Sequence, residues 1–156
     1  RLAIWRAGKD EIVANIEGGR WEPHVGASRD AMARVRALAK GKGDGPVLML
    51  NINRYTAAAG YPDGPAYTEY MRWLEHAVSA DGGSVLWRTP VNDRVIGCDH
   101  DDYDEILAVW YPSHAAFLAL PEADGADRMF EGRAKCVAHA TILSLPGDQD
   151  PLQPSQ

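Results

Sequence analysis

Three segments of this chain have the character of β-strands with apolar side chains on both faces. They are VLML (residues 47–50), ILAVWY (106–111) and ATILSL (140–145). Successive residues of a strand point to opposite faces, so a sheet with one face in water alternates between apolar and polar residues. Because these segments do not alternate, we expect both faces of their sheet to be covered.

The other segments place these strands in an order. Residues 63–83 have apolar side chains at helical spacing and are expected to form a helix that ends at Asp81-Gly82-Gly83. Ser113 is a suitable N-cap for a second, short helix. A further helix is expected in the second half of residues 122–135. SVLWRTP (84–90) is typical of a strand, and DRVIG (93–97) is expected to continue in extended form after a Pro-Val-Asn-Asp bend. The order β, α, β, β, α, β predicts an α+β, ferredoxin-like fold with an antiparallel sheet and helices on one side.

The second face of this sheet needs a cover that the expected helices do not supply. A second copy of the chain is the simplest cover, so we expect a homodimer with sheets packed face to face. Trp87 and Arg88 are neighbours in one strand and must point to opposite faces. We expect Trp87, with Val85 and Thr89, on the helix side, where it can stack on tyrosines. Arg88 is then structural, and it becomes the anion anchor only if the faces are reversed.

Composition argues against several functional classes. The net charge of −6 does not fit a nucleic-acid-binding surface. No apolar run approaches the roughly 20 residues that span a bilayer, and the chain does not start with a secretory signal pattern. Cys98 and Cys136 have neither zinc spacing nor the density of a disulfide scaffold. We therefore expect a cytoplasmic protein without nucleic-acid or membrane partners.

Several longer motifs together suggest a family. They are PVLMLNINRY, AYTEYMRWLEHAV, GGSVLWRTPVNDRVIG, DDYDEILAVWYPSHAAFLAL and FEGRA. Over roughly residues 28–146 the chain resembles the domain-of-unknown-function 1330 family of the dimeric α+β barrel superfamily. The resemblance implies the fold, a dimer, and a ligand pocket between helices and sheet. Relatives in that superfamily include cofactor-free monooxygenases, lactone isomerases, dehydratases and haem proteins, so the resemblance does not select a reaction.

With this resemblance the chain divides into three parts. Residues 1–44 are expected to form an N-terminal helical extension, with a short helix near residues 9–19 and a second helix capped by Ser28. Residues 45–146 form the dimeric α+β barrel domain, and residues 147–156 a flexible polar tail.

Two asparagines are candidates for ligand binding. Asn51 and Asn53 share a strand face with apolar residues, and buried amides need hydrogen-bonding partners. They either bind a ligand at the pocket mouth or fasten a neighbouring loop. Tyr67, Tyr70 and Trp87 are candidates for aromatic pocket walls, with core packing as the alternative.

Three charged or titratable residues are candidates for catalysis. Arg133, in FEGRA, and Arg88 suit a carboxylate or enolate oxygen, or else they pair with the acidic residues at 104 and 105. His139 lies among apolar residues, which is more typical of a core histidine. Its ordinary pKa near 6.5 still makes it the best general base in the chain.

The acidic run CDHDDYDE (98–105) lacks the spacing of a calcium-binding loop, so we expect a solvated turn and no metal site. Taken together, these features favour a small-molecule enzyme that works without a tightly bound cofactor on an oxygenated, partly aromatic or cyclic substrate. Isomerisation, dehydration and oxidation all fit. A non-catalytic dimeric small-molecule-binding protein is the alternative, and haem binding through a histidine is a third hypothesis.

Overall fold

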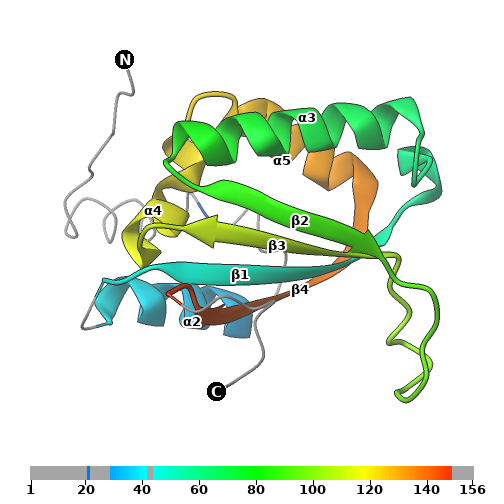
Figure 1. The fold of residues 1–156 in the computed structure, drawn as a ribbon, viewed down its shortest axis with the longest axis horizontal. Helices are drawn as coiled ribbons and strands as arrows, with labels where there is room; N and C mark the ends of the chain where they lie inside the picture. Colours follow the sequence, from blue (N-terminus) through cyan, green and yellow to red (C-terminus); the bar gives the residue numbers. More distant parts are fainter. Residues whose placement is uncertain (1–20, 22–28, 42–43, 149–156) are drawn as a thin grey trace.

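The computed structural model describes Trp21, residues 29–41 and residues 44–148. Its elements are α2 (Arg29–Lys40), β1 (Val47–Tyr55), η2 (Ala57–Ala59), α3 (Pro65–Ala80), β2 (Ser84–Pro90), β3 (Glu105–Tyr111), α4 (His114–Ala119), η3 (Leu120–Glu122), α5 (Ala126–Cys136) and β4 (Val137–Pro146). This order confirms the expected α+β, ferredoxin-like fold, preceded by one helix (Figure 1). The helix expected near residues 9–19 and the Ser28 cap lie outside the described residues.

One antiparallel sheet with the strand order β2-β3-β1-β4 organises the molecule. Val47 and Met49 of β1 lie opposite Tyr111 and Val109 of β3, and all four belong to the buried core. Helices α3 and α5 pack against this face, which we call the helix face (Figure 1). The even-numbered residues of β1 and β3 point to the other face, which we call the open face.

Helix α3 forms where the sequence pattern indicates and supplies much of the core. It begins at Pro65, whose fixed φ suits the first helical position. Its buried side chains recur at three- and four-residue steps: Tyr67, Tyr70, Met71, Leu74, Ala77 and Val78. Each large apolar side chain buried in this way contributes about 1.5–3 kcal/mol.

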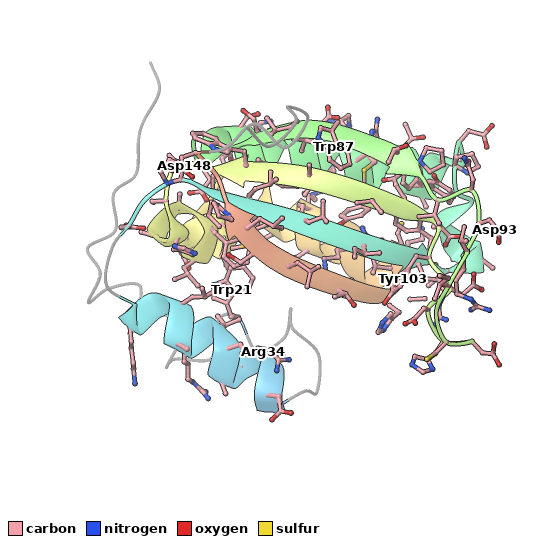
Figure 2. All side chains as sticks on the ribbon, turned by 60° about the horizontal axis from the view of Figure 1, so that its bottom comes forward. Trp21, Arg34, Trp87, Asp93, Tyr103 and Asp148 are labelled. Atoms are coloured by element: carbon pink, nitrogen blue, oxygen red, sulfur yellow. The ribbon has the colours of Figure 1, made fainter. Side chains whose placement is uncertain are left out.

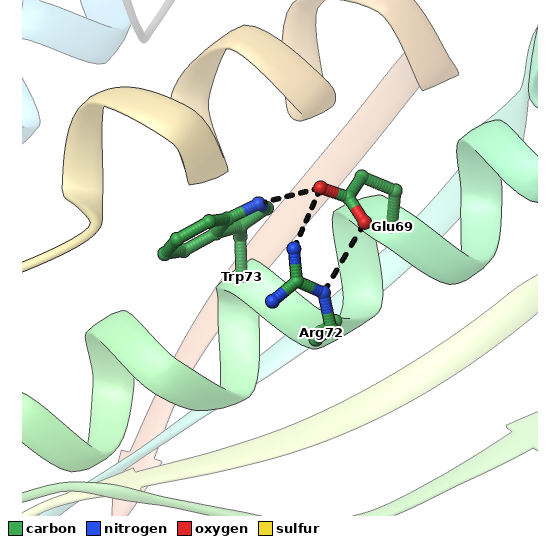
Figure 3. Close-up of polar contacts among 3 residues, drawn as sticks. All are labelled: Glu69, Arg72 and Trp73. Carbon is green, nitrogen blue, oxygen red and sulfur yellow. Dashed lines mark hydrogen bonds and ion pairs between the residues drawn. The ribbon is translucent and has the colours of Figure 1, made fainter.

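The outer surface of α3 has a small polar cluster. Glu69 accepts hydrogen bonds from Arg72 and from the indole N–H of Trp73, each at 2.8 Å (Figure 3). The Arg72 guanidinium also lies 4.6 Å from the centre of the Trp73 ring. These contacts fix Trp73 beside Gly125, which precedes α5 and has a φ of 80°.

Strand β2 contains a bulge that no sequence pattern predicted. Val85 lies opposite Val109, whereas Trp87 lies opposite Ala108, so Leu86 is an extra residue without a partner on β3. Its side chain is 47% exposed. A one-residue bulge reverses the face of every later side chain in the strand. Trp87 therefore points to the open face.

The connection from β2 to β3 is a loop, and the expectation of an extended continuation at residues 93–97 is wrong. The chain folds back because Arg94 donates to the carbonyl oxygen of Cys98, at 2.7 Å. The backbone N–H of Cys98 in turn donates to Asp101. Val95 and Ile96, at the tip, are 89% and 94% exposed.

Candidate functional site

A cavity of about 900 Å³ lies on the helix face of the sheet. Its floor comes from β1, β3 and β4, and its walls come from α3, α4, α5 and α2. The apolar part of its lining includes Met49, Leu74, Leu107, Val109, Phe117, Leu120, Met129, Phe130 and Ile142. A cavity of this size accommodates a drug-sized organic molecule.

Helix α2 and Trp21 close one side of this cavity. Val35 and Leu38 of α2 line it together with Trp21. Figure 2 shows Trp21 between α2 and the rest of the fold. Trp21 is only 5% exposed, and its indole N–H donates to the carbonyl oxygen of Leu118 at 2.7 Å. Its ring lies 5.0 Å from that of Phe117. Trp21 and α2 are thus part of the cavity wall.

A few polar side chains interrupt the apolar lining. Asn51 and Asn53 lie on the floor, and Tyr70 and Arg133 lie on the walls formed by α3 and α5. The amide nitrogen of Asn51 donates to the carbonyl oxygen of Met49, at 3.1 Å. An apolar cavity with a small number of polar groups is typical of a binding site for a small organic molecule.

Tyr70 and Arg133 form the electrostatically distinct part of the cavity. Burial raises the pKa of the Tyr70 phenol to about 12, while the positive charge of Arg133 acts in the opposite direction. Tyr70 therefore remains protonated and can donate a hydrogen bond. Arg133 is half-buried, so its attraction for an anion is screened less than at an open surface.

A second polar group, the tyrosine cluster, lies next to the cavity and consists of Tyr55, Tyr61 and Tyr67 around Glu105. The neighbouring rings are 5.0 to 5.1 Å apart. Glu105 is 3% exposed and accepts hydrogen bonds from the hydroxyls of Tyr55 and Tyr67. Arg88 donates to the Tyr67 hydroxyl at 3.3 Å. This network satisfies a carboxylate that would otherwise be costly to bury.

The structure separates the predicted site residues into three groups. Asn51, Asn53, Tyr70 and Arg133 meet in the cavity. Tyr67 belongs to the tyrosine cluster because it donates to Glu105, and Arg88 contacts the cluster through the Tyr67 hydroxyl. Trp87 and His139 lie on the open face.

The predicted position of Trp87 is wrong, because the β2 bulge turns it away from the helices. Arg88 instead lies opposite Leu107, on the helix face. Its contact with Tyr67 shows the arginine to be a partner of the tyrosine cluster. The Trp87 indole nitrogen is buried and has no hydrogen-bond partner among the described residues.

His139 lies apart from the cavity. It is exposed, its ring stacks on Tyr103 at 5.9 Å, and its β4 neighbours Ala140 and Ile142 are the ones that face the cavity. The expectation of a histidine enclosed by apolar residues is therefore wrong, because β4 is an edge strand and its apolar sequence does not imply burial.

Three residues of the site were not among the sequence-based candidates. Trp21 lies between the two helices expected in residues 1–44, where a lone tryptophan is a signal of burial. His114 is half-buried and lines the cavity at the start of α4. Glu105 was grouped with the acidic turn, but it is the first residue of β3.

Within residues 44–148 and the other described segments, no group of three or more His, Cys, Asp or Glu side chains is arranged to hold a metal ion. No helix in the same segments is long and apolar enough to cross a membrane. Within the acidic run, Asp101 accepts a hydrogen bond from the backbone N–H of Cys98. Asp104 accepts one from the backbone N–H of Tyr55, on β1.

Comparison with known proteins supports the fold. The chain is similar to the crystal structure of a protein of unknown function from Rhodopseudomonas palustris, with 28% sequence identity and a TM-score of 0.62. The match covers 84% of this chain and 98% of that one. The methylated form of that protein matches with the same identity and TM-score, over 85% of this chain. No protein-family model and no curated protein matches.

Proposed function

We propose that this protein binds a ring-containing organic acid in the cavity on the helix face. The observation that carries the proposal is the cavity itself: about 900 Å³, mostly apolar, with Arg133 as a cationic side chain on the α5 wall. Apolar walls favour a ring or chain through the hydrophobic effect. A guanidinium offers paired N–H donors that match a carboxylate.

Arg133 is the stronger candidate for the anion anchor. Arg88 donates to Tyr67 in the tyrosine cluster and is not among the residues that line the cavity. Arg133 lines the cavity beside Tyr70, a protonated phenol that can donate to the same anion. An anion bound between these two side chains would replace its hydrogen bonds to water with hydrogen bonds from a charged guanidinium and a neutral phenol.

A catalytic role is the second candidate, and His114 is the observation that favours it. His114 lines the same cavity as Arg133, and histidine exchanges protons near neutral pH. This residue takes the role of general base that the sequence analysis gave to His139. An isomerisation, dehydration or oxidation of a bound acid requires such a group within reach of the substrate.

The test is calorimetric titration with 2-naphthoate, a fused-ring carboxylate. We expect saturable binding of one molecule per chain. Arg133→Met should weaken it by about thirty-fold, the equivalent of about 2 kcal/mol for a partly buried charged contact. Arg128→Met is the matched control, because Arg128 is exposed on the same helix and does not line the cavity. Equal effects of the two substitutions, or no saturable binding, would refute the proposal.

The homodimer is part of the same proposal. The open face of the sheet presents Leu50, Ile52, Trp110 and Leu143, and α3 and α5 lie on the other side (Figure 1). Leu143 is 47% exposed. A contiguous apolar surface of this kind marks an interaction site, and a second copy presents the same surface in return.

Light scattering tests the dimer. We expect twice the chain mass at micromolar concentration, and the mass of one chain for Leu143→Glu. Ala134→Glu, at an exposed position of α5, is the control and should stay dimeric. A wild-type chain that is monomeric at this concentration rules the dimer out. The free thiols of Cys98 and Cys136 fit a cytoplasmic location, which we include in the proposal.

A further inference from the structure

The amide group of Asn53 has a direction that its neighbours impose. Asn53 is 3% exposed and lines the cavity floor. Its amide nitrogen donates to the hydroxyl oxygen of Tyr55, at 3.3 Å. Because nitrogen and oxygen lie on opposite sides of an amide, this contact leaves the oxygen as the atom available to the cavity. The direction depends on Tyr55 acting as the acceptor.

Tyr55 must act as the acceptor because its single hydroxyl hydrogen is already used. That hydroxyl donates to one carboxyl oxygen of Glu105, at 3.2 Å. Burial raises the pKa of the Tyr55 phenol far above its ordinary range, so the hydrogen remains in place. A phenol oxygen that donates its hydrogen to a carboxylate has only lone pairs for a third group. Asn53 can therefore present only N–H toward Tyr55.

The other side of Glu105 is fixed in the same way. Arg88 has donors only, so its contact with the Tyr67 hydroxyl makes that oxygen an acceptor. The Tyr67 hydrogen is then directed to the second carboxyl oxygen of Glu105. Each carboxyl oxygen thus receives one phenol hydrogen. The chain of donors runs from Asn53 and from Arg88 inward to Glu105.

The floor of the cavity therefore presents acceptors. Asn51 donates one of its two amide hydrogens to the carbonyl oxygen of Met49. This contact fixes the side on which the nitrogen lies and leaves the oxygen, like that of Asn53, as the acceptor for the cavity. These two oxygens lie two residues apart on one face of β1. A ligand that covers them loses water from both unless it supplies hydrogen-bond donors, and an unpaired buried carbonyl is costly.

We propose that Glu105, through Tyr55, sets the direction of the Asn53 amide so that the cavity selects organic acids carrying a hydroxyl or amine donor away from the carboxylate. The inference rests on the proposed function, since Arg133 holds the carboxylate and the asparagines receive the donor. It assigns Tyr55 and Glu105 as positioning residues. They act on the ligand only through Asn53.

Matched probe molecules separate selectivity for a hydrogen-bond donor from binding of organic acids in general. The probes are 2-naphthoate, its 6-hydroxy and 7-hydroxy derivatives, and the methyl ethers of those two hydroxyls. A methyl ether keeps the oxygen and removes the donor. We expect at least one hydroxyl derivative to bind about ten-fold more tightly than its ether, as one neutral hydrogen bond allows.

Two variants of the tyrosine cluster provide the decisive comparison. Tyr55→Phe keeps the ring but frees the Asn53 amide to turn, so the preference for the hydroxyl over the ether should fall to about one. Tyr67→Phe removes the other phenol from the same carboxylate but leaves the Asn53–Tyr55 contact, so the preference should persist. If Tyr55→Phe does not fold, Asn53→Ala tests the same acceptor and should also abolish the preference.

The outcomes distinguish the two proposals. Arg133-dependent binding of 2-naphthoate without any hydroxyl preference refutes this inference and leaves the proposed function standing. A preference that Tyr55→Phe and Tyr67→Phe reduce equally shows a general effect of the tyrosine cluster on stability, and it also refutes the assigned roles. If none of the probes binds, the proposed function fails and the inference fails with it.

Discussion

Asp81 allows a quantitative test of how this fold treats a buried charge. It directly follows helix α3, and its Oδ2 atom is buried without a hydrogen-bond partner among the described residues. Burial raises the pKa of its carboxyl from the ordinary 3.8 to about 7. The negative end of the α3 dipole acts in the same direction. The folded protein therefore carries an energetic penalty whenever Asp81 ionises.

The sign and size of this penalty follow from the two pKa values. The folded state holds the proton more tightly than the unfolded state, so the free energy of unfolding falls as the pH rises from about 4 to about 7. One pKa unit corresponds to about 1.4 kcal/mol, which gives about 4 kcal/mol for a fully shielded group. Asp81 is partly exposed and solvent screens its charge, so we expect about 2 kcal/mol.

The perturbation is Asp81→Asn, which removes the ionisation at almost constant shape. We expect the variant to be more stable than the wild type by about 2 kcal/mol near pH 8 and nearly equal to it near pH 4. Urea unfolding at fixed protein concentration, followed by tryptophan fluorescence, measures both values. Glu75→Gln, at an exposed position of the same helix, is the control. A difference between Asp81→Asn and wild type that does not change with pH would refute the reasoning.

Three further predictions test the local structure. Deletion of Leu86 should leave a folded protein, because it removes only the unpaired residue of the bulge. Deletion of Ile106 from the regular strand β3 should prevent folding, and circular dichroism compares the two variants. Gly125→Ala should lower the free energy of unfolding by about 2 kcal/mol, since φ is 80° and the new Cβ would lie 2.6 Å from a side-chain carbon. Gly45→Ala, with open space around the Cβ, should be neutral in the same urea titration. Trp21→Phe should lower the free energy of unfolding by about 1 kcal/mol, because it removes the buried hydrogen bond to Leu118. An unchanged unfolding midpoint would show that this hydrogen bond does not contribute to stability.

The sequence predicts the strands well because a strand buried on both faces contains consecutive apolar residues without polar alternation. Met49 and Leu50 are adjacent apolar residues of β1 that point to opposite faces, as the lack of alternation indicates. The same reasoning fails at β2, where Leu86 is one more apolar residue in an apolar strand. Whether such a residue pairs or bulges depends on its partner strand, which lies about twenty residues further along the chain. One unpaired residue is enough to reverse the positions expected for Trp87 and Arg88.

The cavity was predictable in part. Its location between helices and sheet follows from the fold, and Asn51 and Asn53 follow from their position on an apolar strand face. The contribution of α2 and Trp21 does not, because no motif in the sequence of α2 indicates which surface of the fold it packs against. His139 illustrates the opposite error, since apolar neighbours in sequence suggest burial only for strands with a partner on each side.

The hydrogen-bond chain around Glu105 depends on a pairing that no local pattern contains. Asn53 and Tyr55 are two residues apart on β1 and therefore share a face. Glu105 follows six acidic or polar residues and resembles the end of a solvated turn. Only the antiparallel register of β1 and β3, which places Asn53 opposite Glu105, brings the carboxylate within reach of the Tyr55 hydroxyl. The direction of one amide in the cavity is thus determined by a contact between residues 50 positions apart, and selectivity for a hydrogen-bond donor follows from sheet register.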